Sequence, residues 1–224
     1  MARDFASGDF IDYGADASIG DFVTQTISLW IQMDVLGGNT KIMIAKNSSS
    51  QWFVIIISTG VLRFRHQWTT TEGVWQVTTP VLVIDTRYHI VITYNGGATT
   101  NDPVIYFNGI SQTVTENTTP VGSLTADAAQ SLTSPNLGTV PHYDGLQSHL
   151  AYDNTLWSAA EVNRAKWWGR PKGGLQVYQP LYTDKLINEG VATANGTATG
   201  STVAPFAIPV VRPSSSMMGM GIGW

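Results

Sequence analysis

Short apolar stretches with a two-residue period place the tightest limit on what this chain can fold into. Residues 26–35 alternate apolar and more polar positions, and the apolar positions are Ile27, Leu29, Ile31 and Met33. Residues 61–68 repeat the pattern, with Arg63 and Arg65 on the polar side. Strict alternation is typical of β-strands that bury one face and expose the other. The pattern therefore predicts a fold made largely of antiparallel sheet.

Turn signals separate these stretches at short intervals. Asn108-Gly109 lies between two apolar runs, which is a strong signal for a two-residue hairpin. Residues 86–97 end at Asn95-Gly96-Gly97, a sequence that tolerates positive φ and stops a strand. Residues 52–58 form a continuous apolar run, as expected for a strand that is covered on both faces.

A single stretch has the signals of a helix. Ser158 is an N-cap candidate, Glu161 stands at the capping-box spacing, and Gly169 and Pro171 close the segment. We therefore expect one short helix from Ser158 to Trp168. Many short strands with almost no helix predict an all-β fold, an antiparallel two-sheet jelly-roll sandwich.

The domain boundaries follow from changes in composition. We expect one domain over residues 1–211, with a loop of small residues at about 190–201. Residues 202–211 read as a last strand, which Pro205 and Pro209 place at a sheet edge. Residues 212–224 then form an apolar tail that is rich in Met and Gly.

Charge and cysteine content exclude several classes of partner. Charged residues make up 12% of the 224-residue chain, whereas an average soluble domain has roughly 25%. The formal net charge is −4, so we expect neither nucleic acid nor an anionic membrane as a partner. No cysteine is present, which excludes disulfides and thiolate metal sites. The first residues lack an apolar run of signal-peptide length, which predicts synthesis in a cytoplasm without export.

Five segments, taken in order, resemble the concanavalin A-like, laminin-G-type jelly roll. They are FASGDFIDYG as the first strand, TISLWIQ as the strand with an inward Trp, TRYHIVITYNGG, VIYFNGI, and the closing block LGTVPHYDGLQSHLAYDNTLWSAAEV. The resemblance covers roughly Phe5 to Val162. The continuation, GLQVYQPLYTD and FAIPVVRP, is similar to small laminin-G-like proteins encoded by tailed phages.

The resemblance leaves function open, because this fold carries lectins, glycanases and purely structural modules. Many members have acidic residues before the last helix, at an edge that binds calcium or a ligand. Here that place reads Gly145-Leu146-Gln147-Ser148-His149, without a carboxylate. We therefore expect no metal and no cofactor.

We also expect no enzymatic activity. Glycanases on related scaffolds use two carboxylates on one strand, because one must protonate the leaving oxygen while the other attacks or activates water. The four glutamates, Glu72, Glu116, Glu161 and Glu189, are isolated from one another in the sequence. His66, His89, His142 and His149 form no close ligand pair, and no Gly-x-Ser-x-Gly elbow is present.

Two sets of side chains are candidate binding residues. Trp52, Trp68 and Trp75 flank polar loops and are candidate glycan contacts, although a tryptophan in a sandwich more often packs in the core. Of Trp167 and Trp168, at least one should dock the helix on the sheet. In the tail, we predict a docking peptide whose contacts are Met217, Met218, Met220, Ile222 and Trp224.

Two functional hypotheses follow. The first is a structural protein of a virus particle, a phage capsid decoration or accessory protein located in the virion. Its partners would be other copies of itself, plausibly as a trimer, and a major capsid or other virion protein. The second is a lectin-like, carbohydrate-binding module that attaches to cell-surface glycans.

Overall fold

We analysed a computed structural model of the chain, which describes most of the sequence up to Ala204. The described residues are 2–6, 8–37, 41–46, 51–57, 59–79, 81–135, 143–168, 174–181, 189–192 and 195–204. The tail residues Met217, Met218, Met220, Ile222 and Trp224 therefore lie outside the described residues, as do Pro205 and Pro209.

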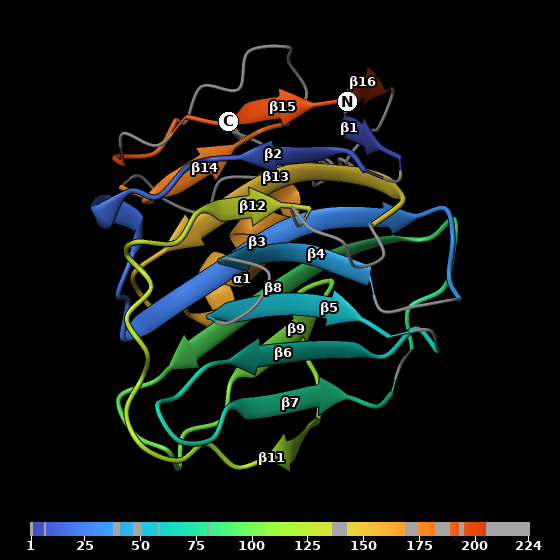
Figure 1. Cartoon of the computed structure of the whole chain (residues 1–224). Helices are drawn as coiled ribbons and strands as arrows, with labels where there is room; N and C mark the ends of the chain where they lie inside the picture. Colours follow the sequence, from blue (N-terminus) through green and yellow to red (C-terminus); the bar gives the residue numbers. More distant parts are fainter. Residues whose placement is uncertain are drawn as a thin grey trace, which may run out of the picture.

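Two antiparallel sheets pack face to face, as the alternating sequence pattern predicted (Figure 1). Sheet A has β3 (Thr24–Met33) at its centre, between β8 (Arg87–Asn95) and β13 (Gly145–Asp153). Its other strands in the described part of the chain are β10 (Ile110–Ser111) and β9 (Val104–Phe107) beyond β8, β1 (Ala2–Phe5) and β16 (Thr202–Ala204) beyond β13, and β14 (Val177–Gln179), which also pairs with β13.

Sheet B forms the other layer of the sandwich. Its order within the described residues is β11 (Val114–Thr118), β7 (Gly73–Val77), β6 (Leu62–His66), β5 (Trp52–Ile56), β4 (Lys41–Lys46), β12 (Leu132–Ser134), β2 (Phe10–Asp12) and β15 (Thr197–Thr199). A short 3-10 helix, η1 (Ala17–Ile19), precedes β3.

The core lies between the two sheets and follows the predicted period. Ile27, Leu29 and Ile31 of β3 enter the main core, so Trp30, between Leu29 and Ile31, lies on the opposite side of sheet A. There it packs with Ala2 and stacks on the His89 ring at 5.2 Å between centroids. The expectation of an inward Trp at this position is therefore wrong, because the register of β3 points the aliphatic residues inward.

The predicted helix is confirmed as α1 (Ala159–Trp168), and it covers the outer face of sheet A (Figure 1). Its capping box forms as expected: the Ser158 N–H donates to Glu161 Oε2 at 2.7 Å, and the Glu161 N–H donates to Ser158 Oγ at 3.3 Å. Val162 and Ala165 bury the helix against the sheet together with Trp157. Trp167 and Trp168 are exposed, so the expectation that one of them docks the helix is wrong.

One turn predicted from the sequence is confirmed, and two other segments differ from the prediction. Asn108 and Gly109 have φ of 53° and 83° and join β9 to β10, as the Asn-Gly signal predicted. Residues 5–14, expected as one strand, instead divide between β1 of sheet A and β2 of sheet B. The loop expected at about 190–201 contains β15, which pairs with β2.

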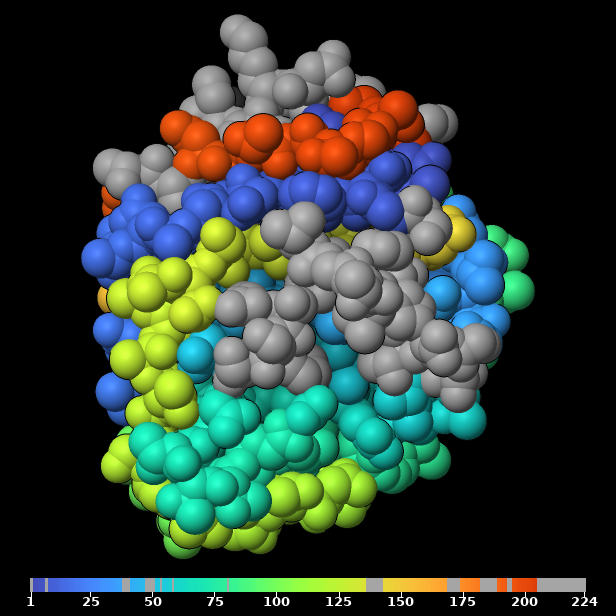
Figure 2. All heavy atoms as spheres, viewed as in Figure 1, coloured from blue at the N-terminus to red at the C-terminus, as the bar shows by residue number. Residues whose placement is uncertain are grey.

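The two sheets differ in what covers their outer faces. Figure 2 shows the outer side of sheet B, where β6 and β7 reach the surface without a helix over them.

Among the described residues, no helix combines the length and hydrophobicity that crossing a membrane requires.

Candidate functional site

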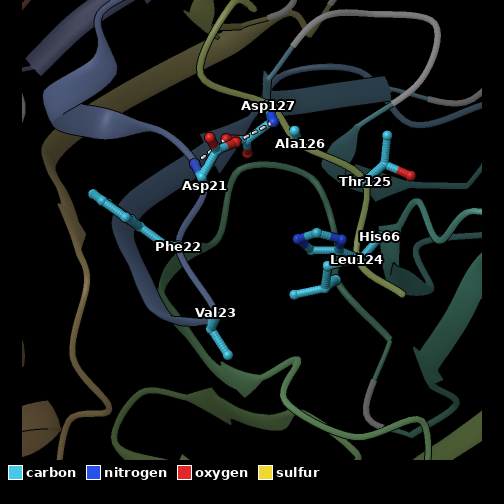
Figure 3. A pocket seen from close by; sticks show the side chains of 8 residues that line it. All are labelled: Asp21, Phe22, Val23, His66, Leu124, Thr125, Ala126 and Asp127. Atoms are coloured by element: carbon cyan, nitrogen blue, oxygen red, sulfur yellow. Dashed lines mark hydrogen bonds between the residues drawn. The ribbon is translucent and has the colours of Figure 1, made fainter. Parts of the chain in front are cut away.

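A small hollow at one end of the sandwich is the best candidate site in the described part of the chain (Figure 3). Its volume is about 190 Å³, and it lies between the segment that leads into β3, the end of β6 and the loop before β12. The lining residues are Asp21, Phe22, Val23, His66, Leu124, Thr125, Ala126 and Asp127.

Asp21 and Asp127, 106 residues apart in sequence, hold two walls of the hollow together. The Asp21 N–H donates to Asp127 Oδ1 at 2.5 Å, and the Asp127 N–H donates to Asp21 Oδ1 at 2.6 Å. Asp21 Oδ1 also accepts the Ala128 N–H at 3.0 Å. Gly20 permits this close approach, because a Cβ at Gly20 would lie 2.3 Å from the Ala128 Cα.

Two residues of sheet B, Trp52 and Lys46, contact Asp127 and hold it in place. Trp52 donates its Nε1–H to Asp127 Oδ2 at 3.0 Å. Lys46, which is fully buried, donates from Nζ to the Asp127 carbonyl at 3.2 Å and lies 3.9 Å from Oδ1. Burial raises the pKa of Asp127 and lowers the pKa of Lys46. Both side-chain oxygens of Asp127 are thus engaged by donors from its own chain, and Asp127 is a structural support rather than a ligand contact.

Asp21 differs from Asp127 in being exposed, with one oxygen free. Its Oδ1 serves the contact with the 127–128 backbone, whereas its Oδ2 has no hydrogen-bond partner among the described residues. The backbone φ of Asp21 is 58°, a left-handed value that Asp and Asn adopt more readily than most residues. A carboxylate oxygen accepts hydrogen bonds and cannot donate them when ionised. Asp21 Oδ2 is therefore an acceptor available to a ligand.

His66 supplies a second acceptor across the hollow. Figure 3 shows its ring turned toward the 21–23 segment, beside Leu124. His66 Nδ1 lies 3.3 Å from the Gln67 carbonyl, and because a carbonyl only accepts, this contact assigns the proton to Nδ1. Nε2 then carries a lone pair and has no partner within the described residues. Burial lowers the pKa of His66 to about 4, so the ring is neutral at pH 5 and above.

The hollow combines these acceptors with apolar surface. Leu124 and Phe22 are half-buried, Val23 is exposed, and the Phe22 ring packs against Tyr152 at 5.1 Å between centroids. A compound with several hydroxyl donors and one apolar face matches this combination. The volume is below the roughly 300–1,000 Å³ of pockets for drug-sized ligands, so it suits one small ring rather than an extended chain.

The outer face of sheet B is the main alternative surface, and two of its arginines already contact neighbouring side chains. Arg63 donates from Nε to Gln76 Oε1 at 2.9 Å, and Arg65 forms an ion pair with Glu72. A ligand on this face would have to displace these contacts, whereas the hollow offers acceptors that are free.

The tryptophans proposed from sequence as glycan contacts are buried in the core, and this prediction is wrong. The exposed fractions are 0% for Trp52, 2% for Trp68 and 0% for Trp75, which leaves no ring face for a sugar. Trp52 and Trp75 instead fix loops, because Trp75 Nε1 donates to Asp102 Oδ1 at 2.7 Å as Trp52 does to Asp127. Trp68 forms an isolated β-bridge with Leu124 and so positions one wall of the hollow.

Residues 145–149, which stand where many family members have an acidic edge, lie in the central strand β13. Gln147 is fully buried, accepts a bond from Ser134 Oγ at 2.7 Å and donates to the Met43 carbonyl at 3.1 Å. His89 is also buried and lies 3.0 Å from Ser28 Oγ. In the described ranges, no three His, Cys, Asp or Glu side chains converge as a metal site would require.

Comparison with protein families identifies the class of fold. The laminin-G-type model of the concanavalin A-like lectin/glucanases superfamily matches residues 6–163. The chain belongs to this superfamily, as the order of its strand motifs indicated. Comparison with curated protein sequences gave no significant match.

Solved structures with the same fold include proteins that bind carbohydrate. A Bacteroides ovatus protein proposed to bind carbohydrate superposes with a TM-score of 0.67 at 17% identity, and the match covers 92% of this chain and 61% of that one. A heptameric SAP-like pentraxin from Limulus polyphemus gives 0.51 at 14% identity, over 88% and 87% of the two chains. The Ruminococcus gnavus IT-sialidase CBM40 bound to alpha2,3 sialyllactose gives 0.50 at 11% identity, over 73% and 95%.

Proposed function

We propose that this protein is a non-enzymatic, carbohydrate-binding module that holds one sugar unit in the hollow at the end of the sandwich. The membership of the superfamily and the carbohydrate-binding proteins among its structural neighbours support this class of ligand. The observation that carries the proposal is the pair of free acceptors, Asp21 Oδ2 and His66 Nε2, on opposite sides of a small and partly apolar hollow. Sugar hydroxyls donate to both, while Leu124 contacts the apolar face of the ring.

The arrangement of Asp21 and Asp127 favours binding over hydrolysis. A glycosidase needs one protonated carboxyl group that can donate to the leaving oxygen and a second that attacks or activates water. Asp127 Oδ1 accepts from the Asp21 backbone and Oδ2 accepts from Trp52, so neither oxygen is free to deliver a proton. Among the glutamates, Glu72 pairs with Arg65, and Glu161 caps α1.

The hypothesis of a virion structural protein has less support than the carbohydrate-binding alternative. It rests on the low charge and on the apolar tail, and its partners and location come from sequence alone. We keep the tail as a sequence-based prediction and base the functional proposal on the hollow.

Titration of the purified chain against neutral glycans tests the proposal. An oligosaccharide array selects a ligand, and calorimetry then measures its Kd for the wild type and for Asp21→Asn and His66→Phe. Asn at position 21 keeps the Oδ1 acceptor that joins the two walls, and Phe at position 66 keeps a ring of similar size. Glu116→Gln on β11 is the control, because it removes one negative charge from a residue that does not line the hollow.

Each of the two hollow variants should weaken binding about tenfold, since a lost hydrogen bond contributes about 1–1.5 kcal/mol. Glu116→Gln should bind as the wild type does. Release of reducing sugar during incubation would show hydrolysis and refute the non-enzymatic part of the proposal. Binding that neither hollow variant changes would remove the hollow as the site.

A further inference from the structure

Two exposed tryptophans lie at the C-terminal end of α1, away from the hollow. Trp168 is 74% exposed and Trp167 is 38% exposed, whereas the other described tryptophans are buried. Trp168 has no ring contact or hydrogen bond within the part of the chain that the structure describes. The helix does not need either ring for docking, because Val162 and Ala165 bury it against the sheet. The exposed indoles are therefore available to a partner outside the fold.

The β9–β10 hairpin holds the polar neighbours of these rings in place. The φ of Gly109 is 83°, and a Cβ added there would lie 2.5 Å from Asn163 Oδ1 and 3.4 Å from Lys166 Cδ. The turn thus packs closely against these two helix side chains. Lys166 in turn places Nζ 4.6 Å from the centroid of the Trp167 ring, a cation–π contact. We call Asn163, Lys166, Trp167 and Trp168 the helix-end platform.

The charged residues next to the helix-end platform in the sequence are positive, in a chain whose net charge is −4. The sequence contains no Asp or Glu between Glu161 and Asp184. Glu161 lies at the opposite end of the helix, where it accepts bonds from Ser158. Lys166 has no ion pair within the described residues, and its amine is partnered only by the Trp167 ring. An anionic group would find an attractive site here.

We propose that the helix-end platform binds an anionic polysaccharide, a glycan chain whose sugar units carry carboxylate groups. Lys166 and Trp168 are two positions apart and lie on different sides of the helix end, so neighbouring units of one glycan chain contact them: the C–H face of one sugar stacks on Trp168, and the carboxylate of the next accepts from Lys166 Nζ. The inference rests on the proposed function only in assigning a sugar ligand, since the helix-end platform is a separate surface from the hollow. A membrane surface is a poorer match, because Asn163, Arg164 and Lys166 interrupt the apolar area of the helix.

The test uses two forms of one polymer that differ in charge alone. Polygalacturonate carries a carboxylate on each unit, and its fully methyl-esterified form keeps the rings without the charge. Affinity electrophoresis and calorimetry on the full chain compare the wild type with Trp168→Ala, Lys166→Gln and, as a charge-matched control on β4, Lys41→Gln. Asp21→Asn serves as the control for the hollow.

Trp168→Ala should weaken binding of both polymer forms about tenfold or more, because both stack on the ring. Lys166→Gln should weaken only the charged form, and it should flatten the salt dependence of that binding. Lys41→Gln and Asp21→Asn should leave polygalacturonate binding unchanged.

Several results would overturn the inference. Polygalacturonate binding that survives Trp168→Ala, or that Asp21→Asn abolishes, would assign the ligand to another surface. Binding to vesicles of phosphatidylglycerol and phosphatidylcholine that Trp168→Ala abolishes, with no binding of polygalacturonate, would assign the helix-end platform to a membrane. Loss of neutral-sugar binding in the hollow variants together with unchanged polygalacturonate binding in Trp168→Ala would uphold the proposed function and reject this inference alone.

Discussion

Tryptophan occupies two contrasting environments in this molecule. Trp52 and Trp75 are buried between the sheets, and each indole N–H donates to a loop carboxylate, at 3.0 Å to Asp127 and at 2.7 Å to Asp102. Trp157, buried under α1, donates in the same way to Asp153 at the end of β13, at 2.7 Å. Trp168, in contrast, extends from the last position of α1 into solvent.

Burial separates these structural tryptophans from Trp168, and the indole N–H of Trp52, Trp75 and Trp157 also has a carboxylate acceptor, whereas Nε1 of the buried Trp30 and Trp68 has none among the described residues. Burial favours an acceptor for the indole N–H, and where a loop carboxylate supplies one, as Asp127 and Asp102 do, the hydrogen bond also fixes that loop. Trp52 and Trp68 thus position Asp127 and Leu124, two residues that line the hollow, while they remain buried themselves. An exposed Trp needs no acceptor within the fold, so its ring is available to bind a partner.

Truncation should separate the two environments most strongly. Trp52→Ala removes a fully buried ring and the indole N–H that donates to Asp127 Oδ2. It should therefore lower the free energy of unfolding by about 3–5 kcal/mol. Urea unfolding followed by circular dichroism measures the change. Trp68→Ala, which removes another buried ring, is the comparison, and a loss below about 1 kcal/mol for Trp52→Ala would contradict the assigned role.

Acid should destabilise the interior around the hollow. Burial lowers the folded-state pKa of His66 from 6.5 to about 4, so below pH 6.5 the unfolded chain binds a proton that the folded chain does not. His66 therefore leaves the free energy of unfolding at its full value above pH 6.5 and lowers it as the pH falls toward 4. The decrease is about 2 kcal/mol by pH 5.

Unfolding free energies at pH 7 and pH 5 check this expectation. His66→Phe should lose about 2 kcal/mol less than the wild type between the two values, while Trp168→Ala should lose as much as the wild type. Equal losses in His66→Phe and the wild type would mean that His66 does not titrate as burial predicts. Sugar binding in the hollow should be constant from pH 5.5 to pH 8, because the ring stays neutral there.

Replacing an indole with the smaller ring of Phe, which also removes the N–H, should have a smaller effect than truncation to Ala. Trp75→Phe keeps an aromatic ring beside Tyr94 but removes the donor to Asp102, which should cost about 1–2 kcal/mol. Thermal unfolding of Trp75→Phe and of the double variant Trp75→Phe/Asp102→Asn measures the coupling. Additive effects in the double variant would show that the two residues do not interact.

The smallest effect on stability belongs to the exposed ring. Trp168→Ala should change the free energy of unfolding by no more than about 0.5 kcal/mol, since the residue is 74% exposed and its ring has no hydrogen bond or partner ring among the described residues. Differential scanning calorimetry measures it beside the Trp52→Ala variant. A loss of about 2 kcal/mol would place Trp168 among the structural tryptophans.

Local patterns in the sequence predicted the parts of the fold that depend on neighbouring residues. The alternation through Ile27, Leu29 and Ile31 predicted β3, the Asn108-Gly109 pair predicted a hairpin, and Ser158 with Glu161 predicted the start of α1. Each of these features depends on residues within a few positions of one another, so the sequence contains the whole signal.

The candidate site could not be predicted in the same way. Asp21 and Asp127 meet across 106 residues, and His66 joins them only because β6 ends beside both. The alternation of residues 61–68 places Trp68 on the apolar side with Leu62 and Phe64, a signal that the sequence-based assignment of Trp68 as a glycan contact did not use. Gly20 carried the available clue, because a glycine beside an Asp with left-handed backbone marks a close approach of two chain segments.

The pairing of the first and last described strands has a mechanical consequence. β1 and β16 are antiparallel neighbours, with Ala2 opposite Ala204, so the chain enters and leaves this part of the fold at adjacent points (Figure 1). A pulling force applied to these two points would peel β16 from β1 and load the hydrogen bonds one after another rather than together. The molecule should therefore yield at low tension from this corner, while the central strands β3, β8 and β13 stay folded.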